Sequence, residues 1–100
     1  MDVKVIHEKI RSLVDSVEEE KHELRGKTRD IYVIQRYTRD NNGELEEIYI
    51  SSPQVNISLV INSKGLSSVT YVKDGKIEGK NLNNEEIEKI VEEIVKLLSS

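Results

Sequence analysis

The sequence contains no cysteine, so the chain forms no disulfide bond and offers no thiol for catalysis or metal binding. Long hydrophobic runs are also absent, and a run such as Leu59-Val60-Ile61 is far too short to cross a bilayer. The first residues lack the basic-then-apolar pattern of a secretory signal. We therefore expect a cytoplasmic protein that makes no contact with membranes.

Alanine, phenylalanine and tryptophan are missing as well, and the hydrophobic 36% of the chain is almost entirely isoleucine, valine and leucine. Branched side chains fit the pleated surface of a sheet, so this composition favours strands. The bias toward isoleucine, lysine and asparagine is typical of an AT-rich genome. The 34% of charged residues, together with the lack of cysteine, suits a thermophile. We interpret the chain as an archaeal or viral protein from such a host.

Hydrophobic spacing predicts a helix at each end of the chain. The first helix is predicted over residues 3–25, because apolar residues recur there at three- and four-residue steps. Gly26 is predicted to end this helix. Asn83, followed three residues later by Glu86, has the pattern of a capping box and predicts the start of the second helix. The stripe of the first helix comprises Val3, Ile6, Ile10, Leu13, Val17 and Leu24.

The residues between the two helices read as strands and turns. Residues 31–38 and 45–51 are strands by residue type, and the turn from Asp40 to Gly43 joins them into a hairpin. Pro53 ends the second strand. The next strand shows the clearest period-two alternation in the chain, with Val55, Ile57, Leu59 and Ile61 on one face.

Two further turns continue the predicted meander. Lys64-Gly65 leads into a strand over residues 66–73, and Asp74-Gly75 leads into a short strand over residues 76–80. A two-residue loop at Asp74-Gly75 fixes the register of this hairpin. It places Val72 opposite Ile77 and Tyr71 opposite Glu78.

Together these elements predict an α+β fold. Its order is an N-terminal helix, a four- to five-stranded antiparallel meander and a C-terminal helix, with both helices packed on one face of the sheet. Every connection is short, which favours antiparallel neighbours and a single domain over residues 1–100.

No motif for catalysis, metal binding or cofactor binding stands out. Gly26-Lys27-Thr28 resembles only the end of a phosphate-binding loop, because position 21 is lysine where that loop needs glycine. His7 and His22 are the only histidines, and in one helix they would lie roughly 22 Å apart at 1.5 Å per residue. We interpret the carboxylates after the first hairpin turn as surface charge, namely Glu44, Glu46 and Glu47.

We therefore expect no enzyme activity, no catalytic residue, no metal ion and no cofactor. A pocket between helices and sheet would still allow a small enzyme or a ligand-binding protein, and this remains a third hypothesis.

The first predicted hairpin carries hydrophobic residues on both faces. Ile31 and Val33 point one way, whereas Tyr32 and Ile34 point the other. Two short helices cover only one sheet face, so the second face is either partly buried at the hairpin's end or an interface. We favour a non-enzymatic, homodimeric binding or accessory protein that acts through a sheet or helix surface. The candidate interface residues are Tyr32, Ile34, Tyr37 and Tyr49.

A basic bias between residues 25 and 39 supports an alternative hypothesis, a nucleic-acid-associated regulator. Tyrosines on an open sheet can stack on bases while neighbouring arginines contact phosphates. The net charge of −4 opposes this hypothesis, and acidic residues on the next strand can pair with the arginines. The candidate nucleic-acid contacts are Arg25, Lys27, Arg29, Arg36 and Arg39.

Overall fold

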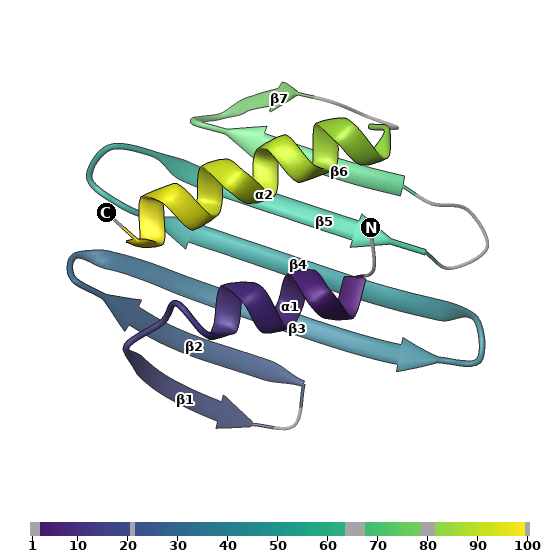
Figure 1. Ribbon diagram of the computed structural model, residues 1–100, viewed down its shortest axis with the longest axis horizontal. Helices are drawn as coiled ribbons and strands as arrows, with labels where there is room; N and C mark the ends of the chain where they lie inside the picture. The colour runs from purple at the N-terminus through teal and green to yellow at the C-terminus, as the bar shows by residue number, and fades with distance from the viewer. Residues whose placement is uncertain (1–2, 21, 64–67, 79–81, 100) are drawn as a thin grey trace.

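The structure is a computed structural model that describes residues 3–20, 22–63, 68–78 and 82–99 (Figure 1). The predicted turn at Lys64-Gly65 lies outside the described residues. The chain runs in the order α1 (Val3–Arg11), β1 (Ser16–Glu20), β2 (Glu23–Thr28), β3 (Ile31–Asp40), β4 (Gly43–Ser51), β5 (Asn56–Asn62), β6 (Ser68–Lys73), β7 (Lys76–Glu78) and α2 (Asn84–Ser99).

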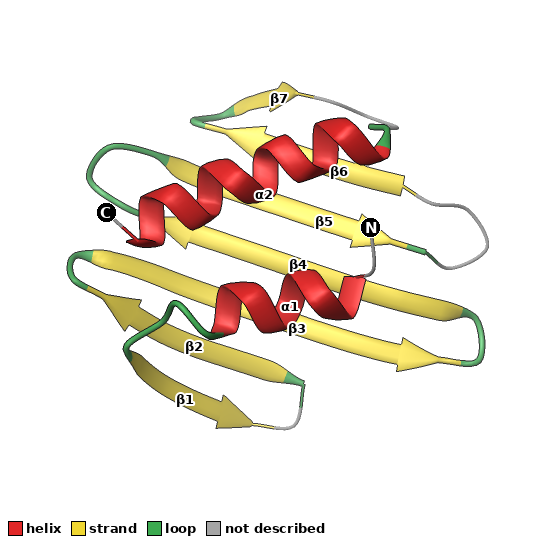
Figure 2. Ribbon diagram, in the orientation of Figure 1, coloured by secondary structure: helices red, strands yellow, loops and turns green. Residues whose placement is uncertain are grey.

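The predicted α+β class is confirmed, but the predicted count of four to five strands is too low. Seven strands within the described residues form one antiparallel sheet in the order β1 to β7, so each strand pairs with its neighbours in sequence. Both helices lie on the same side of this sheet (Figure 2). Helix α1 contacts β3 and β4, and α2 passes over β5 (Figure 1). The molecule is therefore one layer of helix on one layer of sheet.

The predicted first helix over residues 3–25 is wrong, because α1 ends at Arg11. Its last turn closes where the Ser12 hydroxyl donates a hydrogen bond of 2.8 Å to the carbonyl of Lys9. The chain then reverses into the β1–β2 hairpin. Val17 belongs to β1 and is 40% exposed, whereas Leu24 is buried in β2. The apolar spacing beyond residue 11 therefore matched a helix only by coincidence.

Gly26 lies in the middle of β2 and does not end a helix. Val14 packs directly against its Cα, and a Cβ at position 26 would lie 2.1 Å from Val14 Cγ1 and 2.9 Å from the Ser16 carbonyl oxygen. Val14 itself is buried in the main hydrophobic cluster. The small residue thus allows the segment after α1 to lie flat on the sheet.

The hydrophobic core lies between the two helices and the sheet. Alternation along β5 buries Ile57, Leu59 and Ile61 on the helix side, as predicted. Branched aliphatic side chains from both helices meet them. The fully buried hydrophobic side chains include Ile6, Ile10, Leu24, Ile48, Leu59, Val91 and Ile94.

Local turn and cap chemistry is confirmed in three places. Asp40 pairs with Gly43 across the β3–β4 turn. In the β6–β7 hairpin, Val72 pairs with Ile77 and Tyr71 with Glu78, the register expected for a two-residue loop. At the start of α2, the Asn83 side chain accepts a hydrogen bond of 2.9 Å from the Glu86 amide, and Glu86 Oε1 accepts one of 3.3 Å from the Asn83 amide.

The contact between Val14 and Gly26 leads to a stability prediction. The Gly26→Ala substitution should lower the free energy of unfolding by about 1–3 kcal/mol, because the new methyl group overpacks the core. Alanine otherwise tends to stabilise a strand relative to glycine, so the sign of the effect is diagnostic. Urea denaturation monitored by circular dichroism measures it. In a double-mutant cycle, Val14→Ala should offset part of the loss, and an unchanged stability of Gly26→Ala would contradict the packing.

Candidate functional site

The sheet has one face that neither helix covers, here called the open face. Alternation along β3 buries Val33 and Gln35 beneath the helices and turns Tyr32, Ile34 and Arg36 to the other side. The same alternation places Tyr49 on the open face of β4, beside Ile34 in the strand register. The open face therefore contains residues of both β3 and β4, and the structure shows that these two strands are neighbours.

The open face carries a shallow apolar depression of about 270 Å³ near the β4–β5 and β6–β7 turns. Tyr32, Ile34 and Tyr49 line it, and Val72 of β6 lines it from the far side. Tyr32 is 55% exposed, which is unusual for so large a side chain. Three of the four candidate interface residues thus share one surface. The fourth, Tyr37, lies on the helix side, where its ring packs beside that of His7.

Charged residues flank this depression in mutually neutralising pairs. Arg36 Nε lies 3.3 Å from Glu23 Oε2, and Arg25 Nε lies 2.6 Å from the other oxygen of Glu23. Hydrogen bonds from Arg25 and Arg36 hold the pKa of Glu23 below its ordinary value. The Tyr49 hydroxyl donates a hydrogen bond of 2.6 Å to Glu47, which raises the pKa of that tyrosine.

The five candidate nucleic-acid residues do not form one patch. Arg25, Lys27 and Arg36 share the open face, where Lys27 Nζ lies 5.2 Å from the centre of the Tyr32 ring. Arg29 instead donates a hydrogen bond of 2.6 Å to the Leu97 carbonyl near the end of α2. Arg39 lies 3.7 Å from Glu44, near the β3–β4 turn.

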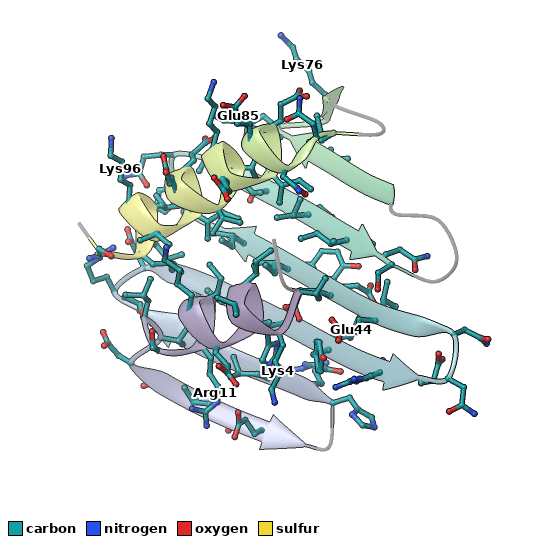
Figure 3. The ribbon with its side chains drawn as sticks, turned by 45° about the vertical axis from the view of Figure 1, so that its right-hand side comes forward. Lys4, Arg11, Glu44, Lys76, Glu85 and Lys96 are labelled. Carbon is teal, nitrogen blue, oxygen red and sulfur yellow. The ribbon has the colours of Figure 1, made fainter. Side chains whose placement is uncertain are left out.

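A second site lies on the helix side, between α1 and the β1–β2 hairpin. It is a cavity of about 310 Å³, called the His7 cavity, and Figure 3 shows Arg11 reaching from α1 toward β1 at this side of the molecule. The guanidinium of Arg11 binds both carboxylate oxygens of Glu19, and this contact lowers the pKa of Glu19. The lining residues are His7, Glu19, His22, Glu23, Leu24 and Tyr37.

The expectation that His7 and His22 lie far apart is wrong. Because α1 ends at Arg11, the chain returns along β1, and His22 lies in the β1–β2 turn. The His22 carbonyl accepts a hydrogen bond of 3.0 Å from the Tyr37 amide, which ties the turn to β3. Both histidines consequently line the same cavity.

Behind the cavity wall, His7 Nδ1 lies 2.9 Å from Oε2 of Glu46. Glu46 is fully buried, so its interpretation as surface charge is wrong. The Gln35 amide donates a hydrogen bond of 2.6 Å to the His7 carbonyl, and the rings of His7 and Tyr37 are centred 5.3 Å apart. Period-two alternation already signals this burial, because Glu46 shares a face with Ile48 and Ile50.

Burial controls the protonation of this pair. Desolvation raises the pKa of Glu46 to about 8, against the opposing effect of the neighbouring Gln35 amide, while Glu47 adds to the rise. Desolvation also lowers the pKa of His7, and Glu19 partly offsets that change. At neutral pH both groups are therefore uncharged. We assign the shared proton to Glu46 Oε2, which donates to His7 Nδ1 and leaves Nε2 as the other ring nitrogen available for contacts.

Within the described residues, no group of three or more histidine, cysteine or acidic side chains is arranged to hold a metal ion. None of the described helices is long and apolar enough to span a membrane. Comparison with protein-family models, curated proteins and solved structures finds no match for the chain. The contact between Glu46 and His7 beside the cavity is an arrangement that can hold one proton between a carboxyl group and an imidazole.

The buried carboxyl predicts a pH-dependent stability. In the unfolded chain Glu46 loses its proton near its ordinary value of 4.5, whereas in the fold it keeps the proton to about pH 8. The unfolded state thus binds fewer protons in this range, and the free energy of unfolding falls as the pH rises. The opposing effect of His7 is confined to pH values below its ordinary value of 6.5. Between about pH 6.5 and 8 the loss should reach about 2 kcal/mol, at about 1.4 kcal/mol per pH unit.

Urea denaturation of wild type and Glu46→Gln across this pH range tests the prediction. Glutamine has no proton to lose, so the variant should show a flat profile and exceed wild type in stability near pH 8. Glu44→Gln, on the same strand but partly exposed, is the matched control and should keep the wild-type decline. A parallel decline in Glu46→Gln would show that Glu46 is not the responsible group.

Proposed function

We propose that the protein is a non-enzymatic binding or accessory protein that forms a homodimer, with the open face of one copy packed on that of a second. The observation that carries this proposal is the apolar depression on a sheet face without a helix. Exposed apolar patches on small soluble domains commonly mark interaction sites.

The dimensions of the molecule suit such a sandwich. Its principal extents are 37 × 30 × 20 Å, and the shortest matches one helix layer on one sheet layer. The broad face is therefore larger than the roughly 800 Å² that each partner buries in a standard interface. Sheets that pack face to face lie about 10 Å apart with interdigitating side chains. Tyr32 and Tyr49, which both line the depression, are residue types that concentrate interface energy.

The charges around the depression favour a second copy as the partner. A two-fold interface brings the same patch of each copy together, so it must be complementary to itself. The flanks carry both signs, since Arg36 lies between Glu23 and Glu47. Two copies can therefore exchange ion-pair partners at the rim without bringing like charges together. The pair of Ile34 and Tyr49 is uncharged and supplies the centre of the proposed interface.

The nucleic-acid alternative is supported by one specific arrangement. Arg25, Lys27 and Arg36 share the open face with Tyr32 and Tyr49, and aromatic residues on an open sheet can stack on unpaired bases. Against it, Arg25 and Arg36 are bound to Glu23 and the chain carries a net charge of −4. We therefore rank it second.

Ile34→Asp tests the dimer. Burying a carboxylate at the centre of the interface should convert a particle of twice 11.5 kDa into one of 11.5 kDa. Sedimentation velocity across the micromolar range measures the mass. Val5→Asp is the matched control, because Val5 is 53% exposed on α1, away from the open face, and this variant should remain dimeric. A wild-type monomer at every concentration, or a dimer that persists in Ile34→Asp, would overturn the proposal.

Fluorescence anisotropy with a labelled single-stranded oligonucleotide separates the alternative from the dimer. A nucleic-acid function predicts binding that weakens steeply with salt and is lost in Arg36→Ala. Arg39→Ala is the control, because Arg39 lies away from the Arg25, Lys27 and Arg36 group. Absence of binding at low salt would end the alternative and leave the dimer proposal intact.

A further inference from the structure

The His7 cavity is not used by the proposed dimer, because it lies on the helix side of the sheet. It combines three kinds of surface within about 310 Å³. Leu24 supplies an apolar wall, Tyr37 an aromatic ring, and His7 an imidazole whose Nδ1 is already engaged with Glu46. A site with these walls accepts a short hydrocarbon chain that ends in one polar group.

The electrostatics of the cavity select the sign of that polar group. The charges that act on His7 are those of Glu19, Arg11 and Glu8, so acid outweighs base. The carboxylate of Glu19 stays ionised because Arg11 is bound to it. An anion would meet this acidic surplus, whereas a cation is attracted to it and can also lie against the face of Tyr37. Glu46 adds a carboxyl group that can become negative when a positive charge arrives.

We propose that the His7 cavity binds a small organic cation with a primary ammonium group, which exchanges for the proton held between His7 and Glu46. Without the cation, Glu46 is a neutral acid and His7 a neutral imidazole with its hydrogen on Nε2. On binding, the proton of Glu46 moves from Oε2 to Nδ1, and the hydrogen on Nε2 leaves to water. Nε2 then accepts a hydrogen bond from the ammonium group. One proton is released, and the site gains one negative charge beside the positive charge of the ligand.

In this exchange the carboxylate of Glu46 and the ammonium group of the ligand compensate each other's charge, so neither charge is buried alone. An ionised Glu46 without a counter-charge would be desolvated, and burial disfavours that form. The His7 Nδ1–H would instead donate to the carboxylate across the existing 2.9 Å contact, so no rearrangement of the backbone is required. Gln35 keeps α1 in place by its bond to the His7 carbonyl. His7 and Glu46 thus couple the binding of a cation at the cavity wall to the ionisation of a carboxyl group in the interior.

Several other charged or titratable groups act on the cavity or the buried pair, and each has to be separated from Glu46 in the test. On the helix side they are Glu8 and Arg11 of α1, Glu19 of β1, His22 of the turn and Tyr37 of β3. Glu23 of β2 and Glu47 of β4 also contribute, although their carboxylates pair with Arg36 on the open face.

The test uses butylammonium, which has the ionisation chemistry of a lysine side chain and stays charged throughout the range studied. Chemical shifts of the His7, His22 and Tyr37 signals are followed as the ligand is added at several values between about pH 6 and 7.5. One released proton per ligand predicts that Kd falls about tenfold per pH unit. Glu46→Gln should bind weakly and without pH dependence, because it has no proton to exchange. His22→Gln should keep the wild-type pH dependence.

Butanol and acetate are the matched ligand controls. The proposal is overturned if butanol binds as tightly as butylammonium, if acetate binds more tightly, or if no saturable shift occurs at His7 and Tyr37. It is also overturned if His22→Gln abolishes the pH dependence. Calorimetry of the wild type in two buffers of different ionisation enthalpy counts the released proton directly, so the result does not depend on the folding of any variant. The open-face variant Ile34→Asp should bind butylammonium normally, which keeps this outcome independent of the dimer.

Discussion

Two amphipathic helices have to cover a sheet of seven strands, and they can do so on one face only. Helix α2 and the short α1 lie side by side on that face, and the buried isoleucines of β4 and β5 fill the space beneath them. Because side chains alternate along every strand, the hydrophobic residues between those buried positions must point to the other face. Ile34 and Tyr49 are there for this reason. The apolar open face is thus a consequence of how the core is built.

The shortness of α1 is the second consequence of this arrangement. Nine residues supply only Val3, Ile6 and Ile10 to the core, so the position of the helix depends on further contacts. These come from a polar cluster under the helix: the contact of His7 with Glu46 and the bond from Gln35 to the His7 carbonyl. Oε1 of Glu46 and of Gln35 accept no hydrogen bond from the described residues. A buried polar cluster of this kind lowers the free energy of unfolding. Its specific geometry, however, fixes the position of α1 on the sheet.

Local chemistry explains which parts of the fold were predictable from sequence. The Asp74-Gly75 loop sets the register of its hairpin by backbone conformation alone, with positive φ at both residues, and Asn83 and Glu86 form their cap within one turn of helix. The end of α1 has no such local signal. It depends on Val14 meeting Gly26 twelve residues later, a contact that exists only once the hairpin has formed. The acidic residues of β1 have poor strand propensity, but at a sheet edge charged side chains block pairing with other chains.

The two candidate sites also differ in whether local sequence or long-range contacts determine them. The open-face residues follow from alternation along β3 and β4, and the same alternation groups Tyr37 with Val33 and Gln35 on the helix side. The His7 cavity was hidden by the error at α1, since a continuous helix keeps His7 and His22 apart. Parity alone places Glu46 with Ile48 and Ile50, so its burial was available from the sequence. A carboxyl in register with buried isoleucines has to find a partner or keep its proton. In this fold it does both, because α1 ends early enough for the hairpin to close around His7.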